Sequence, residues 1–471
     1  MKRLAVLLIA LLAAACSPPL PQTSAAPEGL RAPSRAPRFR AGSSPIRHVI
    51  VIMQENRSFD NLFHGFPNAN TVTSGAGKGG KRYTLQKLPL KWAWDLRHDH
   101  PQFLEDYDRA KIDGFNGQIH SFKTGSGCAD AINHPACWII YSDGQIERMA
   151  YSYVDRSQIQ PYWTMASEYA LGDDTFATNN GPSFPSHQYL IAAQSGHASE
   201  VPDGQPWGCD APPSVTVDLL AYGQASPPVF SKATGHETAG PRPCFTYTTL
   251  ADLLDAAHVS WSYYTAWPAT SGLSAFDAIE AVRHGADWKN VKAPDTKIFD
   301  DITGNSLAQV SWVIPTGSKS DHAGPNSGSH GPDWVASIVN AIGNSPYWNS
   351  TAIIVMWDEW GGWYDHVTPP QYPDPKTGAY EGLGFRVPLI VVSPYAKAHY
   401  VSHRQHEIAS SVHFIEETFG LPSLDGADAR ADAFDDMFDF MQPPIPFSPI
   451  PTVVDSRYFA AHDSPAPADD Y

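Results

Sequence analysis

Positive charge is scarce in this chain: 32 Lys and Arg residues stand against 49 Asp and Glu among 471 residues, and the formal net charge is −17. Nucleic acids and anionic membranes are bound mainly by basic surfaces. The balance therefore argues against nucleic acid as a partner and against direct binding to an anionic membrane. It does not exclude a small anionic substrate, because a single site can be locally positive.

Two patterns that would each define an enzyme class are also missing. No G-x-S-x-G is present, so an α/β-hydrolase lacks its nucleophile elbow. The segment SGAGKGGKR resembles a phosphate-binding loop, but the G-x-x-x-x-G-K-[ST] spacing fails because Val72 replaces the first glycine and Gly79 follows Lys78. We interpret this segment as an exposed insertion.

Cysteine is scarce, with five residues in the chain. Apart from Cys16 near the N-terminus the cysteines form an even set, which in an exported protein predicts two disulfides. Of the three possible pairings the simplest joins neighbours, Cys128 with Cys137 and Cys209 with Cys244. A structural zinc site is the alternative, but no C-x-x-C spacing supports it.

The longest apolar run, near the N-terminus, is too short for a typical membrane span. Two basic residues, this run and a small-residue cluster predict a signal peptide over residues 1–15. The sequence Ala-Ala-Ala-Cys at residues 13–16 resembles a bacterial lipoprotein cleavage box and predicts a lipid on Cys16. Ordinary signal cleavage is the alternative. We expect an exported protein, either a periplasmic or outer-membrane-anchored lipoprotein or a secreted one, attached to a membrane only through Cys16.

Composition along the chain suggests one large domain between two tails. Residues 16–45, rich in Pro, Ala, Ser and Arg, are predicted to form a flexible tether. Residues 46–441 are predicted to be a single catalytic domain. Residues 442–471 begin with a Pro-rich segment and are predicted to form a C-terminal strap and tail.

Five short apolar runs predict buried strands, namely residues 48–53, 259–264, 309–315, 351–357 and 387–393. Helical patterns lie between or after them. Near-continuous apolar strands that alternate with helices predict an α/β fold with a mainly parallel sheet sandwiched between helices. Ligands of such sheets collect at the carboxyl ends of the strands.

Polar residues follow three of these strands at the edge where ligands are expected. Their negative charges would repel one another unless a cation or an anionic substrate balanced them. A divalent metal ion, whose identity the sequence leaves open, fits the oxygen-rich set Glu55, Asn56, Asp358 and Glu359. The alternative for each pair is a helix cap or a solvent-facing loop start.

A serine is predicted at the start of a helix in the segment GPSFPSHQ. Exposed N–H groups and the helix dipole at such a position favour a phosphate. A metal ion alongside would lower the pKa of the hydroxyl and make Ser183 a nucleophile without a histidine base. An ordinary N-cap serine is the alternative.

Three histidines and one arginine complete the candidate site. His322 follows an acid near a strand end and is a candidate general acid or substrate ligand. His98 lies in a polar loop where the sequence shows no structural reason for a histidine, and it is a further catalytic candidate. His366 is a candidate ligand or an orienting residue. Arg57 is a candidate phosphate contact, and an ion pair with Asp60 is its alternative.

The ordered motifs VIVIMQENRSFDNLFHGFP, GPSFPSHQYLIAAQSG, SDHAGP and MWDEWGGWYDHVTPP resemble the bacterial phosphoesterase family that joins phospholipases C and acid phosphatases. The fold of that family is similar to that of the alkaline phosphatase superfamily. The resemblance implies that Ser183 is the nucleophile and bridges metal and phosphorus. It implies metal ligands at Glu55, Asn56, Asp358 and Glu359, and substrate- or leaving-group-binding histidines at His98 and His322.

The resemblance implies an exported, metal-assisted hydrolase of phosphoric esters. Family phospholipases C often have C-terminal β-domains and a twin-arginine leader, neither of which this sequence shows. We therefore expect an acid phosphatase acting on a small monoester, with a phospholipase C acting on phospholipids as the alternative. A non-catalytic surface binding protein and a serine esterase with a Ser–His–acid triad are less favoured hypotheses.

Overall fold

The computed structural model describes residues 44–92, 95–118, 146–220, 237–265, 273–315, 317–324, 328–371 and 382–463. The predicted signal peptide, most of the tether, Cys16, Cys128 and Cys137 lie outside these residues. Lipidation of Cys16 and the Cys128–Cys137 bond therefore stay predictions. Within the described ranges no helix is both long enough and apolar enough to cross a membrane.

The strands are β1 (His48–Gln54), β2 (Ser74–Gly77), β3 (Lys81–Thr84), β4 (Gln86–Leu88), β5 (Ser152–Val154), β6 (Ala170–Gly172), β7 (Thr175–Phe176), β8 (Asp218–Leu220), β9 (Glu237–Ala239), β10 (Trp261–Tyr264), β11 (Val291–Lys292), β12 (Val310–Val313), β13 (Thr351–Trp357), β14 (Leu389–Val392), β15 (Tyr400–Ser402) and β16 (His406–Glu407). The helices are α1 (Phe59–Phe63), α2 (His100–Tyr107), α4 (Ile146–Met149), α5 (Gln160–Glu168), α6 (Ser183–Ala192), α7 (Leu250–Ala256), α8 (Glu280–Arg283), α9 (Lys297–Thr303), α10 (Gly331–Gly343), α11 (Ala409–Phe419) and α12 (Ser456–Ala461).

An eight-stranded sheet forms the centre, in the order β11-β10-β12-β1-β13-β14-β6-β15. Neighbouring strands pair parallel except at β14, which is antiparallel to both β13 and β6. All five predicted apolar runs are strands of this sheet. The prediction of an α/β fold with a mainly parallel sheet is therefore confirmed.

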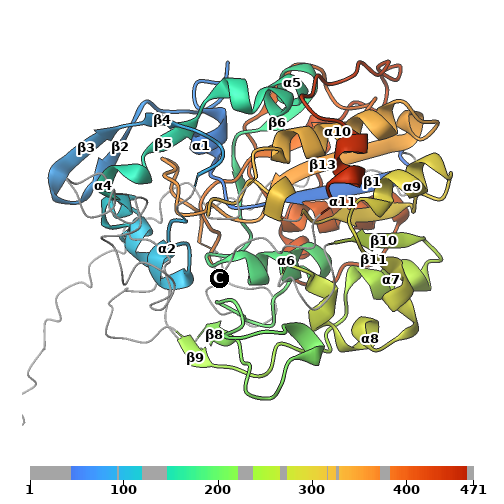
Figure 1. Cartoon of the computed structure of the whole chain (residues 1–471), viewed down its shortest axis with the longest axis horizontal. Helices are drawn as coiled ribbons and strands as arrows, with labels where there is room; N and C mark the ends of the chain where they lie inside the picture. The colour runs from blue at the N-terminus through green and yellow to red at the C-terminus, as the bar shows by residue number, and fades with distance from the viewer. Residues whose placement is uncertain are drawn as a thin grey trace, which may run out of the picture. The chain divides into compact units, whose positions relative to one another are not determined.

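Helices cover both faces of the sheet because its central strands are apolar on both sides. β13 is buried along its whole length, and β1 is buried apart from its first residue. Helix α5 packs on β6 and β14, and α10 packs against α5, α9 and α12. Figure 1 shows α10 on one side of β1 and β13 and α6 with α11 on the other.

The register of the central strands aligns their carboxyl ends. Gln54, the last residue of β1, pairs with Trp357, the last residue of β13. One residue further the Asp358 N–H still donates to the Gln54 carbonyl at 3.0 Å. The residues that follow the two strands are therefore placed side by side. Strand β14 runs in the opposite direction and ends at the other edge, which explains why the run 387–393 leads to no candidate site residue.

A second hydrophobic cluster supports the loops at this edge. It is rich in aromatic side chains and includes Phe103, Phe115, Tyr151, Trp360 and Phe385. The Phe103 ring lies 5.2 Å from that of Phe385 and 5.8 Å from that of Trp360. The segment that contains α2 is thus packed against the turn that follows β13.

Cys209 and Cys244 form a disulfide with a Cα–Cα distance of 4.5 Å. This bond is one of the two expected from pairing neighbouring cysteines. It joins segments 35 residues apart, and in the unfolded chain it would close a loop of that size.

Replacing both Cys209 and Cys244 with alanine is expected to lower the free energy of unfolding by about 2–4 kcal/mol, because the cross-link restricts the unfolded chain. Chemical denaturation followed by circular dichroism measures the change, with the wild-type chain in the same oxidising buffer as reference. An unchanged denaturation midpoint would contradict the prediction.

Candidate active site

The ends of β1 and β13 place two carboxylates together in the interior. The side chains of Glu55 and Asp358 have no solvent-exposed surface. Asn56 lies between them with φ +58°, a left-handed conformation that asparagine tolerates better than most residues. Its N–H donates to Asp358 Oδ1 at 2.8 Å. Position 361 requires glycine, since its φ is +64° and a Cβ there would lie 2.2 Å from the Asn56 carbonyl oxygen.

Helix α6 brings a hydroxyl to the same place. Ser183 is its first residue and is buried, and its Oγ lies 3.4 Å from both Glu55 Oε2 and Asn56 Oδ1. One turn later, Ser186 Oγ donates to the Asp358 carbonyl at 2.9 Å, which fixes the helix against the end of β13. The predicted convergence of the serine with residues from two strand ends is therefore present.

His187 is a site residue that sequence reasoning missed. It lies four residues after Ser183, and residues at this spacing share one face of a helix. Its Nε2 is 3.0 Å from Glu55 Oε1 and 3.9 Å from Asp358 Oδ2, and its side chain is fully buried. The four-residue spacing from the candidate nucleophile was the available signal.

The donor set fits a divalent cation. Ligand atoms of Glu55, His187 and Asp358 all lie within 4.8 Å of one another. Within the described part of the chain, the buried Asp358 Oδ2 makes no hydrogen bond. Two buried carboxylates at this distance repel each other unless a positive charge lies between them. These observations are what a metal site of mixed oxygen and nitrogen donors requires.

Glu359, predicted as a fourth metal ligand, is not part of this group. Its Oε2 accepts a hydrogen bond from the Gly361 N–H at 2.6 Å. Consecutive side chains at a strand end point in different directions, so Asp358 and Glu359 make different contacts. Asp358 belongs to the cluster, and Glu359 supports the turn that follows.

His98 fixes the orientation of the Asn56 amide. Its Nδ1 is 2.7 Å from the Leu96 carbonyl, which can only accept, so Nδ1 bears the proton. With the proton on Nδ1, Nε2 can accept, and it lies 3.2 Å from Asn56 Nδ2. The amide nitrogen of Asn56 is thereby held toward His98, and its oxygen faces Ser183.

His322 lies beside His98, with the two ring centroids 5.7 Å apart. The loop that contains His322 is attached to the end of β1. Gln54 Nε2 donates to the Lys319 carbonyl, and Gln54 Oε1 accepts from the Asp321 N–H, both at 3.1 Å. The His322 Nδ1 contacts the Ala323 carbonyl, so any proton exchange with a substrate would use Nε2.

Arg57 does not lie at the candidate site as a phosphate ligand. Its guanidinium is buried and donates to the Asp321 carbonyl at 2.8 Å, the Leu90 carbonyl at 2.7 Å and Asn61 Oδ1 at 3.2 Å. None of these contacts is to Asp60, so the alternative ion pair is not present either. Burial lowers the pKa of Arg57 to about 10 and raises that of Asp321 to about 6, and attraction between the two groups opposes both shifts.

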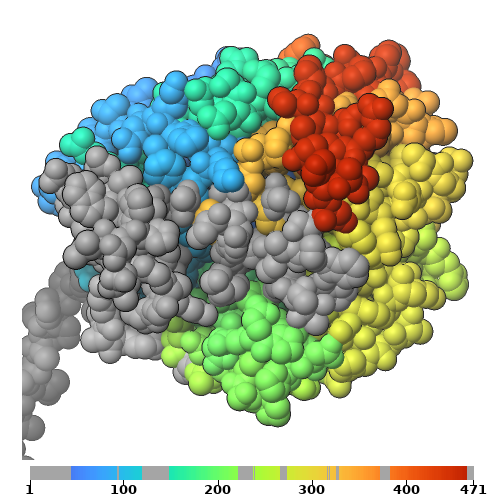
Figure 2. Space-filling view, viewed as in Figure 1, coloured from blue at the N-terminus to red at the C-terminus, as the bar shows by residue number. Residues whose placement is uncertain are grey.

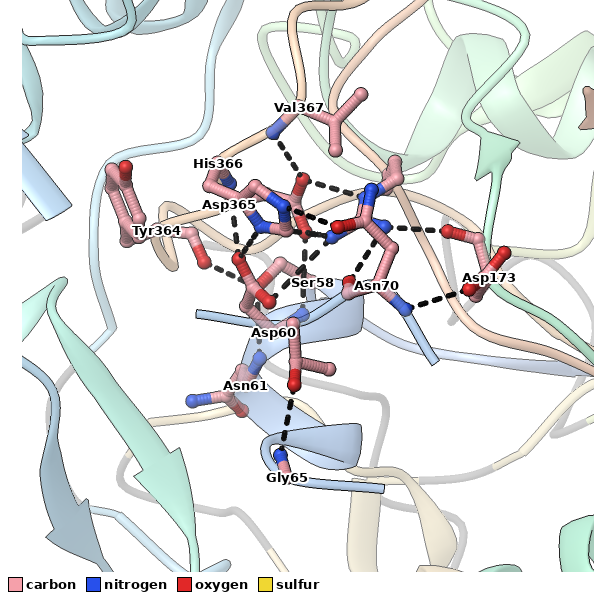
Figure 3. A network of polar contacts seen from close by, with 12 residues as sticks. Ser58, Asp60, Asn61, Gly65, Asn70, Asp173, Tyr364, Asp365, His366 and Val367 are labelled. Carbon is pink, nitrogen blue, oxygen red and sulfur yellow. Dashed lines mark hydrogen bonds and ion pairs between the residues drawn. The ribbon is translucent and has the colours of Figure 1, made fainter. Parts of the chain in front are cut away.

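His366 belongs to a separate polar network, shown in Figure 3. Its Nδ1 is 2.6 Å from Asp60 Oδ2, and its Nε2 is 3.0 Å from Asn70 Oδ1. The Arg386 guanidinium binds both oxygens of Asp365, at 2.8 and 3.1 Å. Arg386 thus supplies the positive charge that these acids need. Both ring nitrogens of His366 thus contact other side chains, and its expected contact with substrate stays a prediction.

A Ser–His–Asp arrangement, which the serine esterase hypothesis requires, occurs away from Ser183. Ser402 Oγ lies 2.9 Å from His406 Nε2, and His406 Nδ1 lies 2.9 Å from Asp432. Both Ser402 and His406 are buried, and the serine hydroxyl donates to Asp436 instead. This arrangement is a structural network that joins β15 to the C-terminal segment.

Residues 46–422 match the Phosphoesterase family. The chain belongs to this family. It is 25% identical to the non-hemolytic phospholipase C of Pseudomonas aeruginosa, over 85% of this chain and 58% of that protein. It is 26% identical to phospholipase C A of Mycobacterium tuberculosis, over 86% of this chain and 80% of that protein. The chain thus spans little more than half of the Pseudomonas enzyme.

Solved structures are more distant. A Vibrio parahaemolyticus protein of the alkaline phosphatase superfamily has a TM-score of 0.34 and 13% identity, over 58% of this chain and 64% of that one. The resemblance drawn from the motifs is confirmed by the family match. Family and relatives together support the expected enzyme class, a hydrolase of phosphoric esters.

Changing either acid of the cluster is expected to weaken binding of a divalent ion. Glu55→Gln and Asp358→Asn each remove a negative donor and should lower the affinity at least about 10-fold. Equilibrium dialysis with Zn²⁺ or Mn²⁺, followed by elemental analysis, measures this without reference to activity. Asp455→Asn, at a half-exposed acid far along the chain, is the control. Wild-type affinity in both site variants would contradict the assignment.

Proposed function

We propose that this protein is an exported, metal-assisted hydrolase of phosphoric diesters, a phospholipase C that uses Ser183 as its nucleophile. The observation that supports it most is the contact of the buried Ser183 hydroxyl with Glu55 and Asn56, inside the cluster completed by His187 and Asp358. The predicted signal peptide supports export, and lipidation of Cys16 remains part of the same proposal.

Glu55, Asp358 and His187 would hold the divalent ion, with Asn56 Oδ1 as a further oxygen donor. A bound divalent ion would lower the pKa of the Ser183 hydroxyl and balance negative charge on the phosphoryl oxygens. The identity of the ion is open, because the set combines hard oxygen donors with a nitrogen donor.

In the first step, Ser183 Oγ forms a bond to phosphorus while the bond from phosphorus to the alcohol oxygen breaks. Glu55 Oε2, which accepts from the Ser183 hydroxyl, is the group toward which that proton moves. Ser183 is the first residue of a ten-residue helix. The N–H groups of the first turn and the helix dipole therefore favour negative charge on the phosphoryl group.

His322 and His98 have different roles in the proposal. His322, protonated at Nε2, donates a proton to the departing alkoxide. The contact of its Nδ1 with the Ala323 carbonyl fixes the orientation of the ring for this transfer. His98 is a positioning residue, since its contacts orient the Asn56 amide. Water then attacks phosphorus and gives a proton to His322 Nε2, the bond to Ser183 Oγ breaks, and the serine recovers its proton from Glu55.

The relatives favour a phospholipid over a small monoester as substrate. The Pseudomonas and Mycobacterium proteins compared above are named phospholipases C, and a relative from Arabidopsis thaliana is named a non-specific phospholipase C. The expectation from sequence, an acid phosphatase, is therefore replaced by its alternative, a phospholipase C. A hydrolase of monoesters remains an outcome of the experiment that follows.

A panel of three chromogenic substrates tests the proposal: p-nitrophenyl phosphorylcholine, p-nitrophenyl phosphate and a p-nitrophenyl acyl ester. The wild-type chain is expected to cleave the diester fastest. Ser183→Ala is expected to lower kcat by at least about 1,000-fold because the nucleophile is gone. Ser214→Ala, an exposed serine, is the matched control. Preference for the monoester would indicate an acid phosphatase, and activity on the acyl ester alone would indicate an esterase.

His322→Ala is expected to affect poor leaving groups most. Loss of a general acid typically lowers the reaction rate about 100- to 10,000-fold when the leaving oxygen needs a proton. The p-nitrophenolate ion leaves without one, so the same variant should lose far less on p-nitrophenyl phosphorylcholine than on a short-chain phosphatidylcholine. Equal losses in kcat on the two substrates would contradict the role of His322.

A further inference from the structure

A C-terminal strap, residues 442–463, runs along α10 from its last turn to its first. Near the last turn the Trp348 indole donates to the Ile445 carbonyl at 2.9 Å. Asn340 then exchanges two hydrogen bonds with the backbone of Ile450, at 2.8 and 2.9 Å. At the first turn, Asp333 Oδ1 accepts from the Val453 N–H at 2.9 Å. The strap lies beyond residue 422, where the family match ends.

The end of the strap is anchored by α12 beside the start of α10. The Phe459 ring is buried and lies edge-on to that of Trp334, 5.2 Å away. Figure 2 shows the C-terminal residues, in red, at the surface beside the yellow and orange segments that include α9 and α10. This packing holds Asp463, the last described residue, at a defined position.

Asp463 forms an ion pair with a buried lysine. Its Oδ1 lies 2.9 Å from Lys319 Nζ, and its Oδ2 accepts from Thr296 Oγ1 at 3.1 Å. Asp295, which is fully buried, contacts the same ammonium group. The ammonium also lies 4.7 Å from the centre of the Trp334 ring. A lysine that is 1% exposed requires such partners, so both acids fix where Lys319 lies.

Lys319 begins the short loop that ends at His322. Its carbonyl accepts from Gln54, two residues later the Asp321 N–H donates to the same side chain, and the His322 N–H donates to Ser320 Oγ at 3.0 Å. The loop is therefore held on one side by the end of β1, beside Glu55, and on the other by the ion pair of Lys319. A shift of Lys319 would pass to His322 through three peptide units.

We infer that Asp463 is a positioning residue, through which the strap fixes Lys319 and thereby aligns His322 with the leaving oxygen of the substrate. This inference rests on the proposed function, because it concerns the residue proposed to protonate the departing alkoxide. Asp463 lies outside residues 46–422, which match the family, whereas Lys319 and His322 lie within them. In this inference the strap therefore completes the alignment of a loop that belongs to the matched residues.

Two substrates that share a phosphocholine group test the inference, a short-chain phosphatidylcholine and p-nitrophenyl phosphorylcholine. Asp463→Asn removes the charge but keeps the size of the side chain. We expect kcat to fall about 10-fold on the phospholipid and less than about 2-fold on the nitrophenyl ester, with KM unchanged on both. Asp463→Glu, which keeps the charge, should restore most of the loss. Asp455→Asn in the same strap is the control, since asparagine caps a helix as well as aspartate does.

Thr296→Val provides a milder second variant, because it removes only the hydrogen bond to Asp463 Oδ2. It should lower kcat on the phospholipid less than Asp463→Asn does, and again leave kcat on the nitrophenyl ester nearly unchanged. The double variant Asp463→Asn with His322→Ala should be no slower on the phospholipid than His322→Ala alone, since Asp463 acts through His322. Equal losses on both substrates, or no loss, would overturn the inference while wild-type activity stands. An inactive wild-type chain would instead overturn the proposed function.

Discussion

Repulsion between two buried carboxylates is the constraint on which the candidate site depends. Glu55 and Asp358 come from strands that are neighbours in the sheet, and parallel pairing in register leaves both acids at the same level. Neither carboxylate is exposed to water, so their charges must be balanced from within. His187 contributes a nitrogen to the same cluster, and the remaining coordination suits a divalent ion. The proposed nucleophile, its activation and the binding of phosphate in the proposed mechanism all depend on this arrangement.

Around this centre the surrounding loops are fixed by polar contacts that leave little freedom. Gln54 binds the loop of His322 through both the oxygen and the nitrogen of its amide, and Arg57 donates to the Asp321 carbonyl of the same loop. On the far side, Lys319 is held by acids from two other segments. Arg386 neutralises the acids near His366 in a comparable way. Arg57, Lys319 and Arg386 thus each bind groups of the protein itself.

The strap lies outside residues 46–422, which match the family, and the inferred role of Asp463 would let it act on a loop within them. Its backbone follows α10 through two hydrogen bonds with Asn340 and one with Asp333, and Asp463 near its end forms an ion pair with Lys319. A change in the strap would be transmitted through a helix and an ion pair and would not require direct contact with substrate. Such an arrangement allows the chemistry to stay constant while the alignment of one residue changes.

The sequence by itself determined the parallel sheet, its apolar strands, and the polar residues that follow β1 and β13, because hydrophobic periodicity and turn chemistry are local. It also placed Ser183 at the start of a helix. Both acids of the pair Asp358 and Glu359 are buried, and only the tertiary structure decided which of them lies beside Glu55 and His187. It selected Asp358 over Glu359, added His187, and turned Arg57 away. These choices depend on strand register and on contacts such as that between Asn56 and Asp358, 302 residues apart, which no local pattern encodes.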